Sequence, residues 1–337
     1  MFWLTFIASI AFWPGVIDSA LSPRWAILAI GIPVMLLLKS KSGRIKSPLR
    51  GLGFLFLLCV SISLFWTPDV YTGIYDLTHL LILSSAVVLG AELDNLDEVW
   101  KGLYCGVVVN IGILFLQYIG WSPVVGMTTA AGLFVNKEIL AETALIAFVA
   151  ALVCKHYKIA ALMIVPILVC QSRTVWLASI VVITLVYVRN YKLLILLIVV
   201  GISSMTALNY TQSIDSFNHR IEMWSIVLSS LKLFGHGIGS WVSQYPLYEY
   251  VHNELLQSVY EIGIFTLIPV FIVFQLLRKY IHDSEYFIFV SIVAVSFFWF
   301  PYHMPITGFV TALAVGCIAN RRNLFQSVDS DISVKTE

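Results

Sequence analysis

Charge is scarce in this 337-residue chain, in which Asp, Glu, Lys and Arg together make up only 12% of the residues. A soluble domain carries about 25% charged residues, so the composition argues against a soluble globular protein. The net charge of +1 supplies no overall positive field, which argues against a nucleic-acid partner. The five cysteines lie inside apolar stretches without CxxC spacing or histidine partners, so we interpret them as small packing residues rather than as metal ligands.

Apolar residues dominate instead, at 59% of the chain with a mean hydropathy of +0.90. They occur in blocks rather than at amphipathic spacing, which predicts an all-α polytopic membrane protein. About twelve blocks can be recognised, and several are shorter than the ~20 residues that a span needs, so ten or eleven spans stay open. The blocks are residues 3–17, 25–38, 51–66, 77–91, 99–119, 139–154, 157–171, 174–188, 193–208, 255–277, 286–300 and 304–319.

The distribution of basic residues predicts the orientation. Residues 39–50 carry five basic side chains and no acidic one, so the positive-inside rule places this segment in the cytoplasm. Twelve alternating spans then place both termini in the cytoplasm. Only five of the twenty Lys and Arg residues fall outside: Arg24, Lys137, Arg173, Arg220 and Lys232. No small-residue cleavage site follows the first block, which we therefore expect to be retained as a helix.

One long polar stretch interrupts the blocks, at about residues 209–253, and it falls on the outside. Within it Ile221, Trp224, Leu228 and Leu231 recur at helical spacing, which predicts an amphipathic helix along the membrane surface. We expect residues 1–322 to form a single transmembrane domain and residues 323–337 a polar cytoplasmic tail. The sequence shows no internal repeat.

The most informative polar residues lie where this outside loop becomes an apolar helix: His252, Asn253, Glu254 and Glu261. Ionisable groups at membrane depth cost about 2.5–3.5 kcal/mol each on insertion scales, so they tend to mark a functional site. A neutral imidazole can accept a proton from a hydroxyl group, and nearby carboxylates could raise its basicity and orient its ring. The alternative is an interfacial histidine that anchors the loop.

Two arginines are predicted on the same side as His252. Arg173 lies between two apolar blocks with almost no loop, and a planar guanidinium there suits a phosphate group bound in a bidentate way. The alternative is a structural ion pair with Glu138 or Glu142. Arg220 begins the amphipathic stretch, and its alternative role is contact with solvent or with lipid headgroups.

A further polar group precedes the sixth block, where Asn136, Lys137 and Glu138 could line a cavity. The alternative for this segment is a helix N-cap. His303, which is also predicted outside, could border the same site. No metal-binding spacing is visible, since the outside histidines and carboxylates are scattered.

These residues resemble the motifs of the O-antigen ligase and polymerase superfamily of bacterial envelope glycan transferases. His252 and Asn253, followed after nine residues by Gly263 and then by Thr266, are similar to the ligase pattern H-[NSQ]-x9-G-x-x-[GTY]. The Gly-rich turn at 235–239 before this pattern also fits the order of elements in the family.

Two upstream segments extend the resemblance to about residues 130–266. Arg173 and Leu177 look like the R-x-x-x-L element that opens a membrane helix in the family, and Gly132, Phe134 and Asn136 look like its G-x-F-x-N segment. The outside loop is short for a ligase, and the chain as a whole is compact.

The resemblance implies a C-type glycosyltransferase-like fold in the bacterial inner membrane with its site on the periplasmic side. It implies an undecaprenyl-diphosphate-linked glycan as donor, with Arg173 and Arg220 on the diphosphate, His252 as general base, and neither metal nor cofactor. The acceptor would be lipid A–core in a ligase, a second lipid-linked glycan in a polymerase, or a protein hydroxyl in an oligosaccharyltransferase. A transporter or flippase for lipid-linked sugars is the alternative from another class, although it predicts two related halves that this chain lacks.

Overall fold

The computed structural model describes residues 1–14, 16, 18–39, 49–123, 130–184, 210–246, 250–277, 284–297 and 299–334. These residues form helices and turns, and no β-strand occurs among them. The predicted all-helical class is therefore confirmed for this part of the chain.

The helices of the first half follow the predicted apolar blocks, except that the helix of the first block, 3–17, already ends at Ile10. They are α1 (Phe2–Ile10), α2 (Leu21–Lys39), α3 (Leu49–Ser63), η1 (Leu64–Trp66), α4 (Val70–Ala91), α5 (Asp97–Tyr118), η2 (Gly132–Phe134), α6 (Lys137–Val153), α7 (Tyr157–Val169) and α8 (Arg173–Ile183). The predicted block at 193–208 lies outside the described residues, as does most of the basic segment at 39–50.

The second half begins with the polar stretch and returns to apolar helices. Its elements are α10 (Tyr210–Ser229), α11 (Ser240–Gln244), α12 (Glu254–Ile262), η4 (Gly263–Thr266), α13 (Leu267–Leu277), α14 (Ser284–Ser296), η5 (Pro301–His303) and α15 (Pro305–Val334). α15 continues through most of the segment for which the sequence predicts a polar tail, because no glycine or proline interrupts the chain after Gly316.

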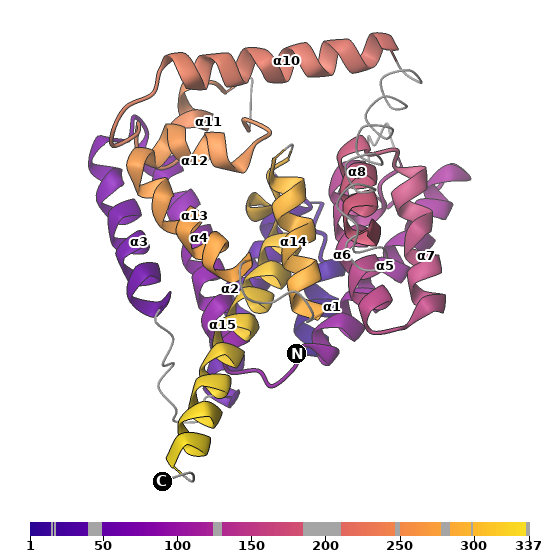
Figure 1. Cartoon of the computed structure of the whole chain (residues 1–337). Coiled ribbons are helices and arrows are strands. Elements are labelled where there is room, and N and C mark those ends of the chain that lie inside the picture. The colour runs from indigo at the N-terminus through magenta and orange to yellow at the C-terminus, as the bar shows by residue number, and fades with distance from the viewer. Residues whose placement is uncertain are drawn as a thin grey trace.

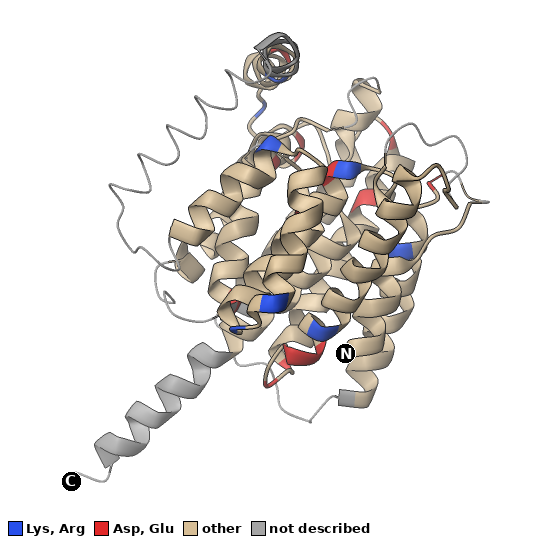
Figure 2. Ribbon diagram, turned by 90° about the vertical axis from the view of Figure 1, so that its right-hand side faces the viewer, with Lys and Arg blue, Asp and Glu red and all other residues tan. Residues whose placement is uncertain are grey.

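Among the described residues, four helical stretches are long and apolar enough to cross a membrane. They are Leu21–Leu38, Val70–Ala91, Asp97–Tyr118 and Glu254–Leu277. Several shorter apolar helices pack beside them, and charged residues gather toward the two ends of the bundle in Figure 2. These features support a membrane protein, whereas the count of twelve spans stays a prediction.

α10 differs from the other long helices because it lies crosswise over one end of the bundle (Figure 1). The expected amphipathic helix is thus present, but its packed face is Met223 and Val227, which are fully buried. Ile221 and Leu228, which the sequence placed on the apolar face, are 45% and 59% exposed.

Close helix contacts depend on small residues, as is usual between membrane helices. α15 packs along α4, and a Cβ atom on Gly316 would collide with the backbone of Val87, as one on Gly90 would with the backbone of Leu313. α1 packs in the same way on α5, where Gly102 faces the backbone of Phe2. These contacts join the first, fourth, fifth and last helices into one core.

Candidate functional site

The site is built on α6, the most deeply buried helix of the bundle. Every residue from Ile139 to Ala151 is buried, and all of them except Glu142 and Thr143 are apolar. Its first turn therefore holds Lys137 and Glu138 at a fixed place on the end of the bundle that α10 covers.

Asn136 caps the helix, since its Oδ1 accepts a 2.8 Å hydrogen bond from the Glu138 backbone N–H. The predicted capping role is confirmed, and it does not exclude a role in a cavity.

Side chains from α2 and α5 fix the segment that precedes α6. The Leu133 N–H donates to Asn110 Oδ1 at 2.8 Å, and the Gly132 N–H donates to Gln117 Oε1 at 2.8 Å. Arg24 Nη2 donates to the Leu133 carbonyl at 3.1 Å. Gly132 has φ +61°, and a Cβ atom there would press on Asn110, so the position requires glycine. The G-x-F-x-N segment thus enters α6 in one conformation.

The loop that carries His252 is fixed from both sides. Trp224 Nε1 on α10 donates to the Val251 carbonyl at 3.1 Å. On the other side Asn253 caps α12, because its Oδ1 accepts from the Leu256 N–H at 3.0 Å, and its Nδ2 donates to the Phe297 carbonyl at 3.0 Å. Asn253 therefore acts on the position of its neighbour His252 through the backbone.

Among the described residues, three of the four non-glycine residues with positive φ lie in the segments just before α6, α8 and α12, and the fourth, Lys155, follows the other end of α6. His252 has φ 56° and Val135 has φ 63°, a left-handed conformation that is a clear outlier for a β-branched residue. Gln171, two residues before Arg173, has φ 53°. Each such residue costs about 1–3 kcal/mol, and such costs persist mainly where function requires them. This concentration of strain supports a functional interpretation of the site.

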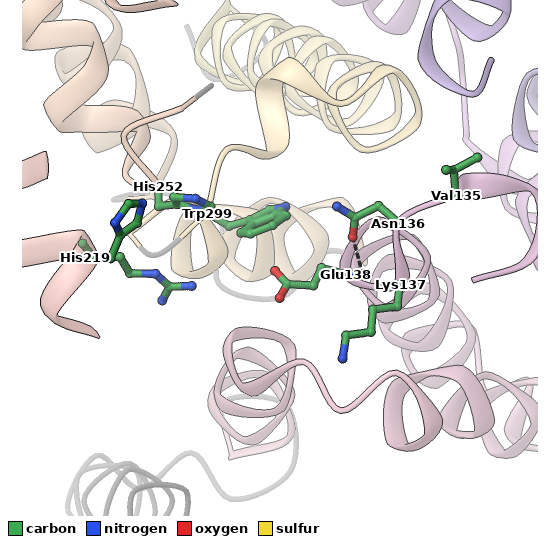
Figure 3. Close-up of a pocket in the computed structure, with 8 residues that line it drawn as sticks. Val135, Asn136, Lys137, Glu138, His219, His252 and Trp299 are labelled. Atoms are coloured by element: carbon green, nitrogen blue, oxygen red, sulfur yellow. Dashed lines mark hydrogen bonds between the residues drawn. The ribbon is translucent and has the colours of Figure 1, made fainter. Parts of the chain in front are cut away.

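A cavity of about 390 Å³, which we call the first cavity, opens between α6, α10, the His252 loop and the end of α14. Its volume lies in the range of small-molecule sites. The lining residues are Val135, Asn136, Lys137, Glu138, His219, Arg220, His252 and Trp299. Figure 3 shows His252 and Trp299 side by side, with the carboxylate of Glu138 pointing into the space beneath them.

Positive groups outnumber negative ones around the first cavity. The pKa of Arg220 is lowered overall, mainly by burial. The carboxylate of Glu138 opposes this shift, and the charge of Arg173 adds to it. Arg173 does not line the cavity itself, but its charge acts on Arg220 from the start of α8. The two predicted arginines are thus brought together around the single carboxylate of Glu138, with Lys137 beside it.

His252 is held as a neutral imidazole. Burial, the charge of Arg220 and that of His219 lower its pKa to about 4. Its Nδ1 atom is buried and has no hydrogen-bond partner within the described part of the chain. Its ring packs instead against Trp299 and Phe300, with centroid distances of 5.1 and 5.2 Å. Ring packing, rather than a carboxylate, therefore orients this histidine.

The expectation that Glu254 and Glu261 raise the basicity of His252 is wrong. Glu254 Oε1 accepts a 2.8 Å hydrogen bond from the Tyr302 N–H and lies 3.3 Å from Nδ1 of His303. Glu261 accepts from Gln257, on the same side of α12 as Glu254. The left-handed turn at His252 sends its side chain into the first cavity, whereas the helix that follows directs the two glutamates into a different one.

Sequence reasoning missed Trp299 and His219 as lining residues. Trp299 lies in an aromatic run at the end of a predicted span, where nothing distinguishes a site residue from an interfacial anchor. His219 precedes Arg220 and could have been found from that adjacency. In the described ranges no group of three or more His, Cys, Asp and Glu side chains is placed to hold a metal ion.

A comparison of the chain with protein-family models finds no match, and a comparison with curated proteins finds none either.

Proposed function

We propose that this protein transfers a glycan from an undecaprenyl-diphosphate donor to an acceptor hydroxyl, as an O-antigen ligase does, on the periplasmic face of the inner membrane. The observation that carries the proposal is the first cavity, which a neutral, strained histidine lines together with Arg220 and Lys137. A transferase of this kind needs a base that is unprotonated at neutral pH and cations for a leaving diphosphate.

The chemistry follows from the charges around the first cavity. The donor's diphosphate would bind between Arg220, Arg173 and Lys137, where guanidinium groups suit bidentate contact with phosphate oxygens. The carboxylate of Glu138 now interacts with these three cations. The diphosphate would compete with Glu138 for the same cations. The long apolar chain of the donor would remain in the bilayer beside the bundle.

Transfer then requires one bond to form and one to break. His252 accepts the proton of the acceptor hydroxyl, and the freed oxygen attacks the anomeric carbon from the face opposite the diphosphate. The bond between the anomeric carbon and the phosphate oxygen breaks, and its electron pair leaves with undecaprenyl diphosphate. The product is inverted at the anomeric carbon, and the arginines stabilise the charge that develops on the leaving group.

The experiment that tests this function is transfer in vitro with purified protein and an undecaprenyl-diphosphate glycan. Separate reactions would contain lipid A–core, additional donor or no acceptor, with EDTA throughout so that any need for a metal is exposed. A glycan–core band identifies a ligase, and a ladder on the lipid identifies a polymerase. Absence of product with every acceptor would contradict the proposal.

The pH dependence should report the low pKa of His252. Because the neutral imidazole is the active form, kcat/KM should be flat from pH 7 down to about 5 and fall only near the pKa of about 4. A bound diphosphate favours the imidazolium, so the acidic limb of kcat should lie at higher pH than that of kcat/KM. The two profiles can be measured at subsaturating and saturating donor, and a kcat/KM limb near 6.5 would contradict this assignment.

Trp299 should act as a positioning residue for His252. Trp299→Ala removes the ring that packs on the imidazole, and we expect kcat to fall about 10-fold or more with a smaller change in KM. Trp299→Phe retains a ring and should recover most of the loss. An equal loss in both variants, or a change in KM alone, would show that Trp299 acts elsewhere.

A further inference from the structure

A second cavity, of about 490 Å³, lies between α3, α4, α12, α13, α14 and α15, and shares no lining residue with the first. Its walls are almost entirely apolar, as Phe56, Leu83, Ile272 and Phe289 illustrate. The volume again suits a small ligand, and walls of this kind suit an alkyl chain.

One end of the second cavity is acidic. Three carboxyl groups line it, from Asp76 on α4 and from Glu254 and Glu261 on α12. Two histidines accompany them, His79 on α4 and His303 in η5. Glu254 pairs with His303, and Gln257 links the two groups, with its Nε2 atom 3.3 Å from Glu261 Oε1 and 3.4 Å from His303 Nε2. No Lys or Arg occurs among the described residues that line this cavity.

The lining of the second cavity contains polar atoms whose hydrogen-bonding capacity is unused. Asp76 Oδ2 and Thr266 Oγ1 are buried atoms without a hydrogen-bond partner among the described residues, and both residues line the cavity. Thr266 is only 3% exposed. Burying a polar atom without a partner costs about 1–3 kcal/mol, and such orphaned atoms call for an explanation. A ligand with several donors would satisfy them.

We propose that the second cavity binds an amphiphile with an alkyl chain and a primary ammonium head, and without a phosphate. The chain would lie along the apolar walls, and the three N–H groups of the head would reach Asp76, Glu261 and Thr266. An ammonium head would bring hydrogen-bond donors and a positive charge to these carboxyl groups, whereas a phosphate would bring negative oxygens close to them. This site is independent of the proposed transferase.

The two cavities thus select opposite head groups. The first gathers Arg220 and Lys137, and the second gathers carboxylates, although His252 and Glu254 are only two residues apart. A donor diphosphate and an ammonium amphiphile would each be repelled from the other's cavity. Binding to the second cavity can therefore be measured without any assumption about transfer.

The experiment is native mass spectrometry of the purified full chain with decylamine, decyl phosphate or decanol at matched concentrations. We expect one decylamine to bind at least 10-fold more tightly than either of the other two. Equal binding of all three would show an apolar groove without head-group selection, and stronger binding of decanol or decyl phosphate would overturn the proposal directly. This comparison needs no variant.

Variants then locate the binding. Glu261→Gln and Asp76→Asn keep the shape of each side chain, and each should weaken decylamine binding at least 10-fold while leaving decanol binding unchanged. Glu98→Gln is the matched control, because this carboxylate is 56% exposed and pairs with Lys101 away from the cavity. Retained decylamine affinity in both cavity variants, with folding verified by their unchanged decanol binding, would also overturn the proposal.

Discussion

Replacing His252 with alanine is expected to abolish product formation while the donor still binds. Loss of a general base costs about 10²–10⁴ in rate. The imidazole carries no charge at neutral pH, because burial and the neighbouring Arg220 lower its pKa to about 4, so its removal takes away no electrostatic contact with the diphosphate. The variant should therefore show a lower kcat with a donor dissociation constant close to that of the wild type.

His156→Ala is the matched control for this experiment, because it removes an exposed imidazole at the opposite end of α6. It should leave kcat and donor binding unchanged. Full activity in His252→Ala would show that another group takes the proton. Loss of donor binding in that variant would show that His252 contacts the diphosphate instead.

Replacing Arg220 with alanine should have the opposite signature, with its main effect on donor binding. Truncating one partner of a close, partly buried charge pair costs about 2–5 kcal/mol, so the donor dissociation constant should rise about 30-fold or more. In this variant Glu138 would also lose its favourable interaction with the Arg220 charge. Equilibrium binding of labelled donor measures this change directly.

Three further variants sharpen the result. Arg220→Lys should recover only part of the affinity, because an ammonium group cannot make the bidentate contact. Arg173→Ala should weaken donor binding less than Arg220→Ala, because Arg220 lines the first cavity and Arg173 does not. Lys232→Ala, which removes an exposed cation beyond the end of α10, should change nothing. Full rescue by lysine would indicate that Arg220 serves only as a point charge.

Much of the first cavity could be predicted from residue types and spacing. A polar side chain at the start of an apolar helix is expected at the end of the bundle. Asn136 and Lys137 at the start of α6 and Arg220 on α10 do line one cavity there. Asn253 was associated with His252 but acts as the cap of α12. Positions of this kind follow from helix periodicity and from the cost of burying charge.

The division between the two cavities could not be predicted in the same way. It depends on the positive φ of His252, whose side chain lines the first cavity while that of Glu254 lines the second. Histidine adopts this conformation more often than most residues, but it is still uncommon, so local sequence preferences do not predict it. It is imposed by contacts from Trp224 and Phe297, which are distant in the sequence.

The sequence does contain a feature from which part of the second cavity could have been predicted. Asp76 and His79 lie three residues apart at the start of an apolar block, and this spacing places both on one face of α4. Ionisable side chains inside an apolar helix mark a site by default. Their partners on α12 and η5 are more than 170 residues away, so only the fold brings the acidic end together.

The most direct test of the central claim is whether the protein cleaves a lipid diphosphate donor. Purified protein in liposomes with EDTA would receive the glycan on undecaprenyl diphosphate or, separately, on undecaprenyl monophosphate, with acceptor present. We expect one undecaprenyl diphosphate to be released for each glycan transferred, and little or no product from the monophosphate donor. Movement of intact diphosphate donor across the liposome membrane, without release of undecaprenyl diphosphate, would contradict the account and indicate a transporter.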